Sequence, residues 1–451
     1  MKKEQTGEIK NVLNNVFPSM ISMVMVLVYN LADTFFIGQT GNAYMVAATS
    51  LVTPAFTMFT ALGVIFGTGG TSLISRKLGE GKSDYAKKIS SFCFWTAVGV
   101  GSVVMIVVLL FNGKIVGILG ATDATREFVR EYLSIVGLSV PFLMISNAFS
   151  QILRAEGKAK KAMMGMILGN LTNIILDPIM ILGFNWGIKG AAIATVIGNV
   201  AGAIFYIMHY LTGKSILSIS IKEYQVGENV AREVLSIGIP AALNNVFMAF
   251  ANIIANNFMV NFGDMAVAGF GVATKVGMIL GMLLMGIGTG VQPLLGFAYG
   301  EGEKEKFDGI FRFSMLISVV TSILITLLIY VGTDELVRAF VTEPDAFQYG
   351  VNFVRIFTIS GPALGILYIL SNALQGMGAA LPSLLVNVSR QGLLYIPLLF
   401  LFSTLFKSAE IITAAQPVAD ILTTILAIVL YICVYKKTIK VLKKKLDIIT
   451  N

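Results

Sequence analysis

The sequence predicts an all-α integral membrane protein with twelve transmembrane helices in two six-helix lobes. Three observations support this fold class: an apolar composition, apolar segments long enough to cross a bilayer, and a repeat that relates the two halves of the chain. Of the 451 residues, 56% are hydrophobic and 13% are charged, and the mean hydropathy is +0.80. Soluble globular proteins are less apolar and carry more charge. The composition therefore excludes a soluble fold.

Twelve segments are apolar over the roughly 20 residues that an α-helix needs to cross a bilayer. The expected spans cover residues 14–37, 46–75, 89–112, 127–150, 162–184, 190–212, 236–261, 266–297, 309–332, 346–374, 383–405 and 411–435.

The two halves of the chain share motifs at a constant spacing. At an offset of 221 residues, four features of the first half return in the second: Gly67-Thr68-Gly69 as Gly288-Thr289-Gly290, Gly79-Glu80-Gly81 as Gly300-Glu301-Gly302, Pro141 as Pro362 and Gly157 as Gly378. Pro18 returns as Pro240, one residue later. A duplication of six spans starts each copy on the same side of the membrane. The two halves are therefore expected to be related by an axis along the membrane normal, as in parallel-repeat transporters.

The repeat and the basic residues set the expected domains and orientation. We expect an N-lobe over residues 1–212, a cytoplasmic linker over residues 213–229 and a C-lobe over residues 230–451, with a central path between the lobes. With the N-terminus inside, the inner segments hold 24 of the 33 Lys and Arg residues, so the positive-inside rule places both termini in the cytoplasm. The net charge of +8 is then explained by topology and anionic headgroups, not by nucleic-acid binding. The expected location is the cytoplasmic membrane, with no obligate protein partner.

The sequence lacks the motifs of disulfide frameworks, metal sites, membrane enzymes and nucleotide-binding sites. The two cysteines, Cys93 and Cys433, fall within expected spans and form no disulfide framework or metal motif. The single histidine, His209, lies at the inner end of a span, without the clustered nucleophile or metal ligands of a membrane enzyme. The glycine-rich runs are not followed by Gly-Lys-Ser/Thr, so there is no Walker A nucleotide site, and close helix packing explains them better. The chain is therefore expected to be no enzyme, to need no cofactor, and to transport a solute by using an ion gradient.

Charged groups inside the spans are the candidate functional residues, because such a group costs about 2.5 kcal/mol or more near the bilayer centre. Of the 25 Asp and Glu residues, only Asp33, Asp177 and Asp420 lie well inside a span. Asp33, Thr195 and Asp177 are placed about 6, 8 and 10 Å below the outer ends of their spans at ~1.5 Å per residue. Asn173 precedes Asp177 by four residues and shares its helix face.

These four side chains offer hard oxygen donors that suit H⁺ or Na⁺. A structural role remains open for both acids, as caps or interhelical contacts, with Asp177-Pro178 marking a kink. In the second half, Lys275, Arg390 and Asp420 are the most deeply placed charges. A buried structural pair or a snorkelling cation explains them at least as well as a contact with substrate does.

Motifs along essentially the whole chain resemble those of the multidrug and toxic compound extrusion (MATE) transporters. The matching stretches are Ala32-Asp33-Thr34-Phe35-Phe36-Ile37-Gly38, Ser75-Arg76-Lys77-Leu78-Gly79-Glu80-Gly81, Leu153-Arg154-Ala155-Glu156-Gly157-Lys158, the run from Asn170 through Asp177-Pro178 to Thr195, Ala298-Tyr299-Gly300-Glu301-Gly302 and Leu374-Gln375-Gly376-Met377-Gly378. The resemblance implies a V-shaped antiporter with a central cavity, which exports cationic or amphipathic drugs in exchange for H⁺ or Na⁺.

The resemblance also implies roles for individual residues. An ion site in the first lobe of related transporters maps onto Asp33, Asn173, Asp177 and Thr195. A second-lobe cation site of another branch uses a Glu in helix 7 and an Asp in helix 10. Here helix 7 carries no acid and the helix 10 position is Asn372, so coupling through the first lobe is expected. Related transporters have been proposed to bend helix 1 when its Asp is protonated, which makes Pro18 the expected hinge.

Two other kinds of membrane transport remain open. A lipid-linked oligosaccharide flippase would have similar helical lobes, but more cationic residues along its cavity and usually more than twelve helices. Only Lys275, Arg355 and Arg390 fall in the spans of this chain. A passive channel is a further alternative, against which the buried acids of the first lobe favour ion coupling.

Overall fold

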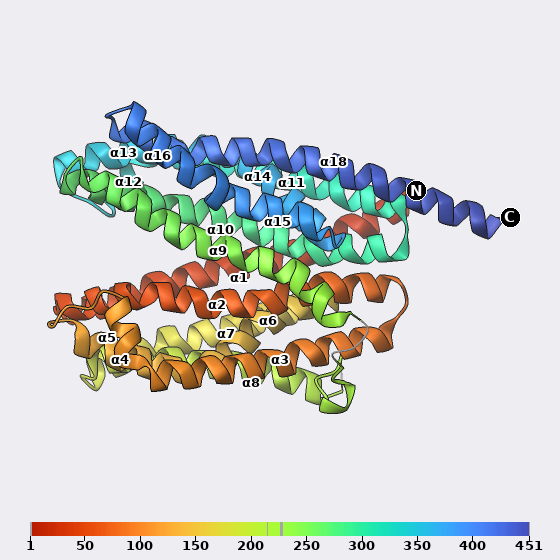
Figure 1. Ribbon diagram of the computed structural model, residues 1–451, viewed down its shortest axis with the longest axis horizontal. Helices are drawn as coiled ribbons and strands as arrows, with labels where there is room; N and C mark the ends of the chain where they lie inside the picture. Colours follow the sequence, from red (N-terminus) through yellow and green to blue (C-terminus); the bar gives the residue numbers. More distant parts are fainter. Residues whose placement is uncertain (1, 214, 226–228, 451) are drawn as a thin grey trace. The chain divides into compact units, whose positions relative to one another are not determined.

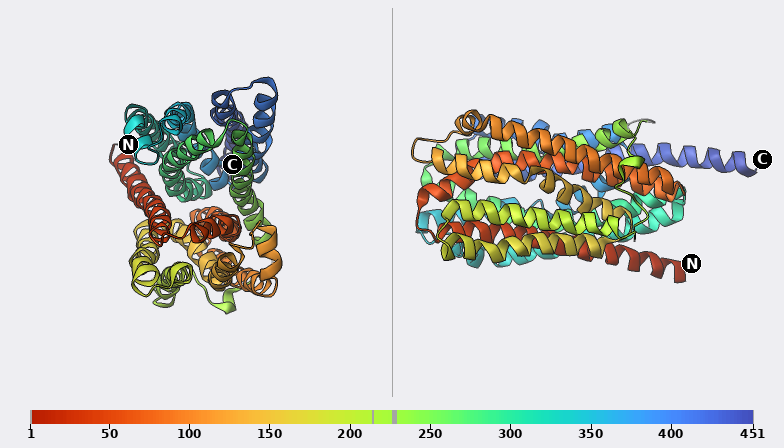
Figure 2. Two further views of the ribbon diagram at one scale, coloured as in Figure 1. Left: turned by 90° about the vertical axis from the view of Figure 1, so that its left-hand side faces the viewer. Right: turned by 90° about the horizontal axis from the view of Figure 1, so that it is seen from below.

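The computed structural model describes residues 2–213, 215–225 and 229–450, and side chains from residue 7 to residue 437 within these ranges. The described residues are helical and contain no β-strand. The chain forms two compact units. The first unit is Ile21–Ala242, and the second unit comprises the residues up to Met20 together with those from Leu243 onward. In each unit the long helices run side by side as a bundle (Figures 1 and 2).

Two long helices, α1 (Lys2–Gly38) and α9 (Val230–Val260), contribute residues to both units. The other elements of the first unit are α2 (Ala43–Gly79), α3 (Ser83–Leu110), α4 (Asn112–Ile118), α5 (Arg126–Leu138), α6 (Val140–Ala155), α7 (Ala159–Asp177), the π-helical turn η1 (Pro178–Gly183), α8 (Gly187–Leu211) and the 3-10 turn η2 (Ile221–Glu223). The other elements of the second unit are α10 (Asp264–Glu301), α11 (Lys304–Val331), α12 (Thr333–Arg338), α13 (Pro344–Thr358), α14 (Gly361–Gly376), α15 (Ala380–Val388), the π-helical turn η3 (Ser389–Tyr395), α16 (Ile396–Leu405), α17 (Ala409–Thr413) and α18 (Ala415–Thr450).

The apolar helices agree with the expected number of membrane spans. Ten described helices are long and apolar enough to cross a bilayer, and the number rises to twelve if two bent helix pairs each count as one span. Two of the twelve expected spans, residues 127–150 and 346–374, are these bent pairs. Helices α5 and α6 meet at 55°, and α13 and α14 meet at 45°.

Proline explains both breaks. Pro141 and Pro362 stand in the first turns of α6 and α14, where each lacks an amide hydrogen and would clash with the carbonyl four residues earlier in a continuous helix. Ser139 and Ser360 stand at the breaks. The Ser139 hydroxyl donates to the Val136 carbonyl oxygen at 2.8 Å and so satisfies a backbone group that the bilayer cannot hydrate. The two breaks occupy repeat-equivalent positions.

The glycine motifs of the repeat allow helices to approach closely, as the sequence predicts. A Cβ atom at Gly290 on α10 would lie 2.9 Å from the Asn15 carbonyl oxygen of α1. A Cβ atom at Gly69 on α2 would collide with the Val234 carbonyl oxygen of α9. Each contact lies within one unit. The first part of α1 therefore packs in the second unit, and the first part of α9 packs in the first unit.

Both helices change units two residues after a proline. The unit boundary in α1 falls between Met20 and Ile21, after Pro18, and the boundary in α9 falls between Ala242 and Leu243, after Pro240. Proline removes an intrahelical hydrogen bond and weakens a helix at this point. The two repeat-equivalent prolines therefore mark the places where a helix leaves one unit for the other.

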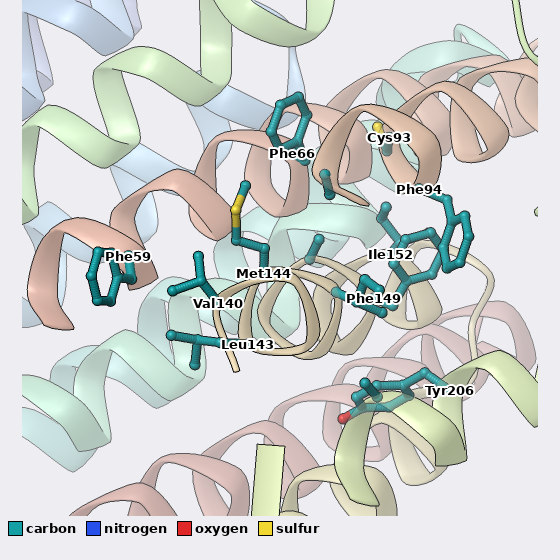
Figure 3. Close-up of a cluster of buried hydrophobic side chains, with 14 of the residues drawn as sticks. Phe59, Phe66, Cys93, Phe94, Val140, Leu143, Met144, Phe149, Ile152 and Tyr206 are labelled. Carbon is teal, nitrogen blue, oxygen red and sulfur yellow. The ribbon is translucent and has the colours of Figure 1, made fainter. Parts of the chain in front are cut away.

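Aromatic packing holds the helices of the first unit in place. Figure 3 shows Phe94 of α3 against Phe149 of α6, with ring centroids 5.5 Å apart in an edge-to-face arrangement. Phe149 also packs edge-to-face on Tyr210 of α8. The Tyr206 hydroxyl donates to the Ala162 carbonyl oxygen at 2.8 Å and so joins α8 to α7. Because this core links α3, α6, α7 and α8, it fixes the two helices that carry Asn173, Asp177 and Thr195.

The described part of the linker is bound to the first unit. The Ser90 and Ser91 hydroxyls of α3 donate to the carbonyl oxygens of Ser218 and Ser220 at 2.6 and 2.7 Å. The buried Glu156 carboxylate accepts from the Ser215 hydroxyl at 2.8 Å. Residues 214 and 226–228 of the expected linker lie outside the described residues. The segment after α8 is therefore fastened to α3 and to the end of α6.

Candidate ion site

The four candidate ion-site residues all lie in the first unit. Asp33 belongs to α1, Asn173 and Asp177 belong to α7, and Thr195 belongs to α8. Asn173, Asp177 and Thr195 are at most 2% exposed, and Asp33 is half-buried. Asp177 is the last residue of α7, and Pro178 begins the π-helical turn that follows it. The helix type therefore changes at Asp177-Pro178, the position of the expected kink.

A glycine contact brings α7 and α8 together at the site. A Cβ atom at Gly198 would lie 2.7 Å from the Gly169 carbonyl oxygen and 3.1 Å from the Asn173 Cβ. A Cβ at Gly169 would lie 2.9 Å from the Gly198 carbonyl oxygen. Because both residues lack a side chain, the backbones approach closely enough for Asn173 Nδ2 to donate to Thr195 Oγ1 at 3.3 Å.

The site holds several buried oxygens that lack a donor. Among the described residues, no hydrogen bond reaches Asp33 Oδ1, Asn173 Oδ1 or either carboxylate oxygen of Asp177. The two carboxyl groups are near enough to interact electrostatically. Two charged carboxylates without donors are costly to bury, so a proton or a bound cation would stabilise them. The donor set of two carboxylates, an amide and a hydroxyl suits a hard cation that prefers oxygen ligands.

Two tyrosines complete the site, and the sequence analysis did not identify them. The Tyr29 and Tyr132 side chains each interact with Thr195 and lie in the electrostatic field of Asp33 and Asp177. Tyr29 precedes Asp33 by four residues, and this spacing could have placed it on the same face of α1. Tyr132 comes from α5, in an arrangement that only the packed bundle shows.

A cavity of about 110 Å³ adjoins the site within the first unit. It is large enough for several water molecules. Asn173, Thr195 and Tyr29 line both the cavity and the site. Amide side chains dominate the rest of its polar lining, which includes Asn147, Asn170 and Asn199. The cavity therefore places several amide and hydroxyl groups next to the oxygen-rich site.

The candidate residues of the second unit contact other side chains or the backbone. Arg390 Nε donates to Asp420 Oδ1 at 2.9 Å, and the two side chains are 13% and 2% exposed. This contact is the buried structural pair that the sequence left as one alternative. The Lys275 ammonium lies 5.4 Å from the centroid of the Phe340 ring. Asn372 is buried, and its Nδ2 donates to the Tyr368 carbonyl oxygen at 2.8 Å.

Comparison with known proteins identifies the family. A sequence model of the MatE family matches the chain twice, over residues 18–179 and residues 240–401. This chain belongs to the MatE family. The two matches also confirm the internal repeat. Since the relatives described below are multidrug export proteins, the expectation that the chain is not an enzyme is confirmed as well.

Curated relatives and solved structures agree with this assignment. The multidrug export protein MepA of Staphylococcus aureus (strain MSSA476) is 30% identical over 409 residues, which are 91% of this chain and 90% of MepA. MepA of Staphylococcus haemolyticus (strain JCSC1435) is 30% identical over 411 residues, with the same shares. The outward-facing structure of a multidrug resistance MATE transporter superposes with a TM-score of 0.90 at 23% identity over 97% of each chain. A Vibrio cholerae MATE transporter gives a TM-score of 0.89 at 22% identity, over 96% of this chain and 98% of the other.

Proposed function

We propose that this MATE protein is a secondary active multidrug efflux antiporter, which exports cationic or amphipathic drugs in exchange for H⁺ or Na⁺. The MepA relatives, whose names describe multidrug export, support the proposed efflux of drugs. The observation that carries the ion coupling is the group of buried oxygens without donors at Asp33, Asn173 and Asp177. These residues lie on helices that are long and apolar enough to cross a membrane.

The proposed site can exchange ions because its charge changes with occupancy. A proton on Asp33 or Asp177, or a Na⁺ held by Asp33, Asn173, Asp177 and Thr195, neutralises carboxylates that are otherwise buried without a counter-charge. Coupling requires only that ion and drug favour different conformations of the protein. We propose that the ion favours the state that releases the drug outside.

The proposed orientation follows from the basic residues. Both termini lie in the cytoplasm by the positive-inside rule, and the protein is inserted in the cytoplasmic membrane. Drugs then leave the cell as the coupling ion enters it. Asp33 and Asp177 would meet the coupling ion from the outer side, where the sequence places them.

Transport in proteoliposomes tests this function. The purified protein is reconstituted, and movement of a fluorescent organic cation is followed under a pH gradient and a Na⁺ gradient that are imposed separately. We expect one of the two gradients to drive uptake into the lumen against the concentration of the dye. If neither gradient drives transport of several chemically different cations, the proposed antiport is wrong.

We further propose that Pro18 is a hinge in the transport cycle, because α1 changes units two residues after it. Pro18→Ala restores a hydrogen bond to the helix and is expected to slow turnover several-fold. Drug affinity in the outward-facing state should stay within a few-fold of the wild-type value. Turnover and affinity are measured at matched reconstitution density.

The matched control is Pro54→Ala. Pro54 also lies inside a long helix, but all of α2 belongs to the first unit. This control should turn over at the wild-type rate. Equal turnover of Pro18→Ala and wild type would show that the proline is no part of the cycle.

A further inference from the structure

The repeat relates a hydrogen bond in the first unit to one in the second. Asn199 Nδ2 donates to Ser139 Oγ at 3.2 Å, and Ser360 Oγ donates to Asp420 Oδ2 at 3.0 Å. Each pair spans 60 residues, and each second-unit residue follows its counterpart by 221 positions. Equivalent positions therefore lie in equivalent surroundings, and Asp420 stands where the first unit has Asn199.

Three residues that line the first-unit cavity have repeat-equivalent positions in the second unit, at the same offset of 221 residues. Asn147, Gly169 and Asn199 line the cavity, and the positions 221 residues later hold Tyr368, Arg390 and Asp420. Tyr368 and Arg390 are larger than their counterparts, and Arg390 bonds to both Tyr368 and Asp420. Besides its contact with Asp420, Arg390 donates from Nη1 to the Tyr368 hydroxyl at 3.1 Å, and its guanidinium carbon lies 5.4 Å from the Tyr368 ring centroid.

The groups around Asp420 are those of a cation-binding site. Its Oδ1 accepts from Arg390 and, at 3.0 Å, from Gln416 Nε2, while its Oδ2 accepts from Ser360. An aromatic face and a carboxylate both attract a guanidinium ion. Here that cation belongs to the chain itself. In contrast, no ion pair involves Asp33 or Asp177 among the described residues of the first unit.

We propose that Arg390 is a tethered cation that permanently occupies a cation site formed by Asp420 and Tyr368 in the second unit. Arg390 fills the place that corresponds to the first-unit cavity, so a free cation can bind only in the first unit. Arg390 and Asp420 thereby determine which repeat takes part in ion exchange. This functional consequence rests on the proposed antiport, but occupancy of the second-unit site by Arg390 does not.

Removing the tether should create a site for a free guanidinium ion. The purified Arg390→Gly variant is expected to bind one more equivalent of radiolabelled guanidinium than the wild-type protein in equilibrium dialysis. The double variant Arg390→Gly with Asp420→Asn should lose this extra equivalent, because its site lacks the carboxylate. Arg390→Lys keeps a tethered cation and should bind no extra guanidinium.

The measurement does not depend on transport, so it can fail or succeed independently of the antiport. A folded Arg390→Gly variant that binds no extra guanidinium would overturn the proposal, and so would an extra equivalent that persists in the double variant. If Arg390→Gly does not fold under ordinary conditions, it is purified in low-millimolar guanidinium chloride. A parallel purification in urea at the same concentration is the comparison. Recovery of monodisperse protein by guanidinium alone supports the proposal, and failure to recover contradicts it.

Discussion

Replacement of Asp33 by asparagine is expected to abolish ion-driven drug efflux and leave a folded protein. The amide keeps the size of the side chain but cannot release a proton or offer a charged oxygen to Na⁺. Because Asp33 Oδ1 has no donor among the described residues, the substitution breaks no hydrogen bond at that atom. Efflux should fall to the level of protein-free liposomes in the gradient assay, while the melting temperature stays at or above that of the wild type.

The matched control for this prediction is Asp123→Asn. The Asp123 side chain is 99% exposed, so the same chemical change there should leave both efflux and stability unchanged. A second measurement separates coupling from drug binding. Asp33→Asn should still bind the drug, measured by fluorescence quenching in detergent. Ion-driven efflux at the wild-type rate in Asp33→Asn would refute the first-unit ion site.

Gly198→Leu is expected to have the second large effect, on both stability and transport. Its Cβ would lie 2.7 Å from the Gly169 carbonyl oxygen, a distance that requires α7 and α8 to move apart. Such overpacking typically costs about 1–3 kcal/mol. The same displacement would break the 3.3 Å contact between Asn173 and Thr195 and remove two ligands from the proposed site. We expect a lower melting temperature and loss of ion-driven efflux.

Gly99→Leu is the control for this prediction. Gly99 is exposed on α3, and a Cβ atom there meets no other atom within 4 Å. It should therefore retain the wild-type melting temperature and the wild-type rate of efflux. Full ion-driven efflux by Gly198→Leu would show that close approach of α7 and α8 is not needed for coupling.

The sequence could predict which polar residues of the first half lie close together, because depth in the membrane follows from counting along a helix. Asp33, Asp177 and Thr195 come from three different spans, and their similar depth indicated a common level. The four-residue spacing of Asn173 and Asp177 placed them on one face of α7. Counting does not give the rotation of each helix about its axis. Tyr132, and the donation from Asn173 to Thr195, therefore appeared only in the packed structure.

By itself, the sequence determined the fold class, the repeat and the family, because composition, span length and motif spacing are properties of the chain. Only the tertiary structure decided which of two interpretations holds at Arg390 and Asp420, where it shows a buried pair. It also located the breaks at Ser139 and Ser360, and the exchange of α1 and α9 between units. The physical reason is that membrane spans are apolar on nearly all faces. Their sequence therefore lacks the amphipathic stripe that would indicate the neighbours of each helix, and the neighbours are set by side-chain packing between segments far apart in the chain.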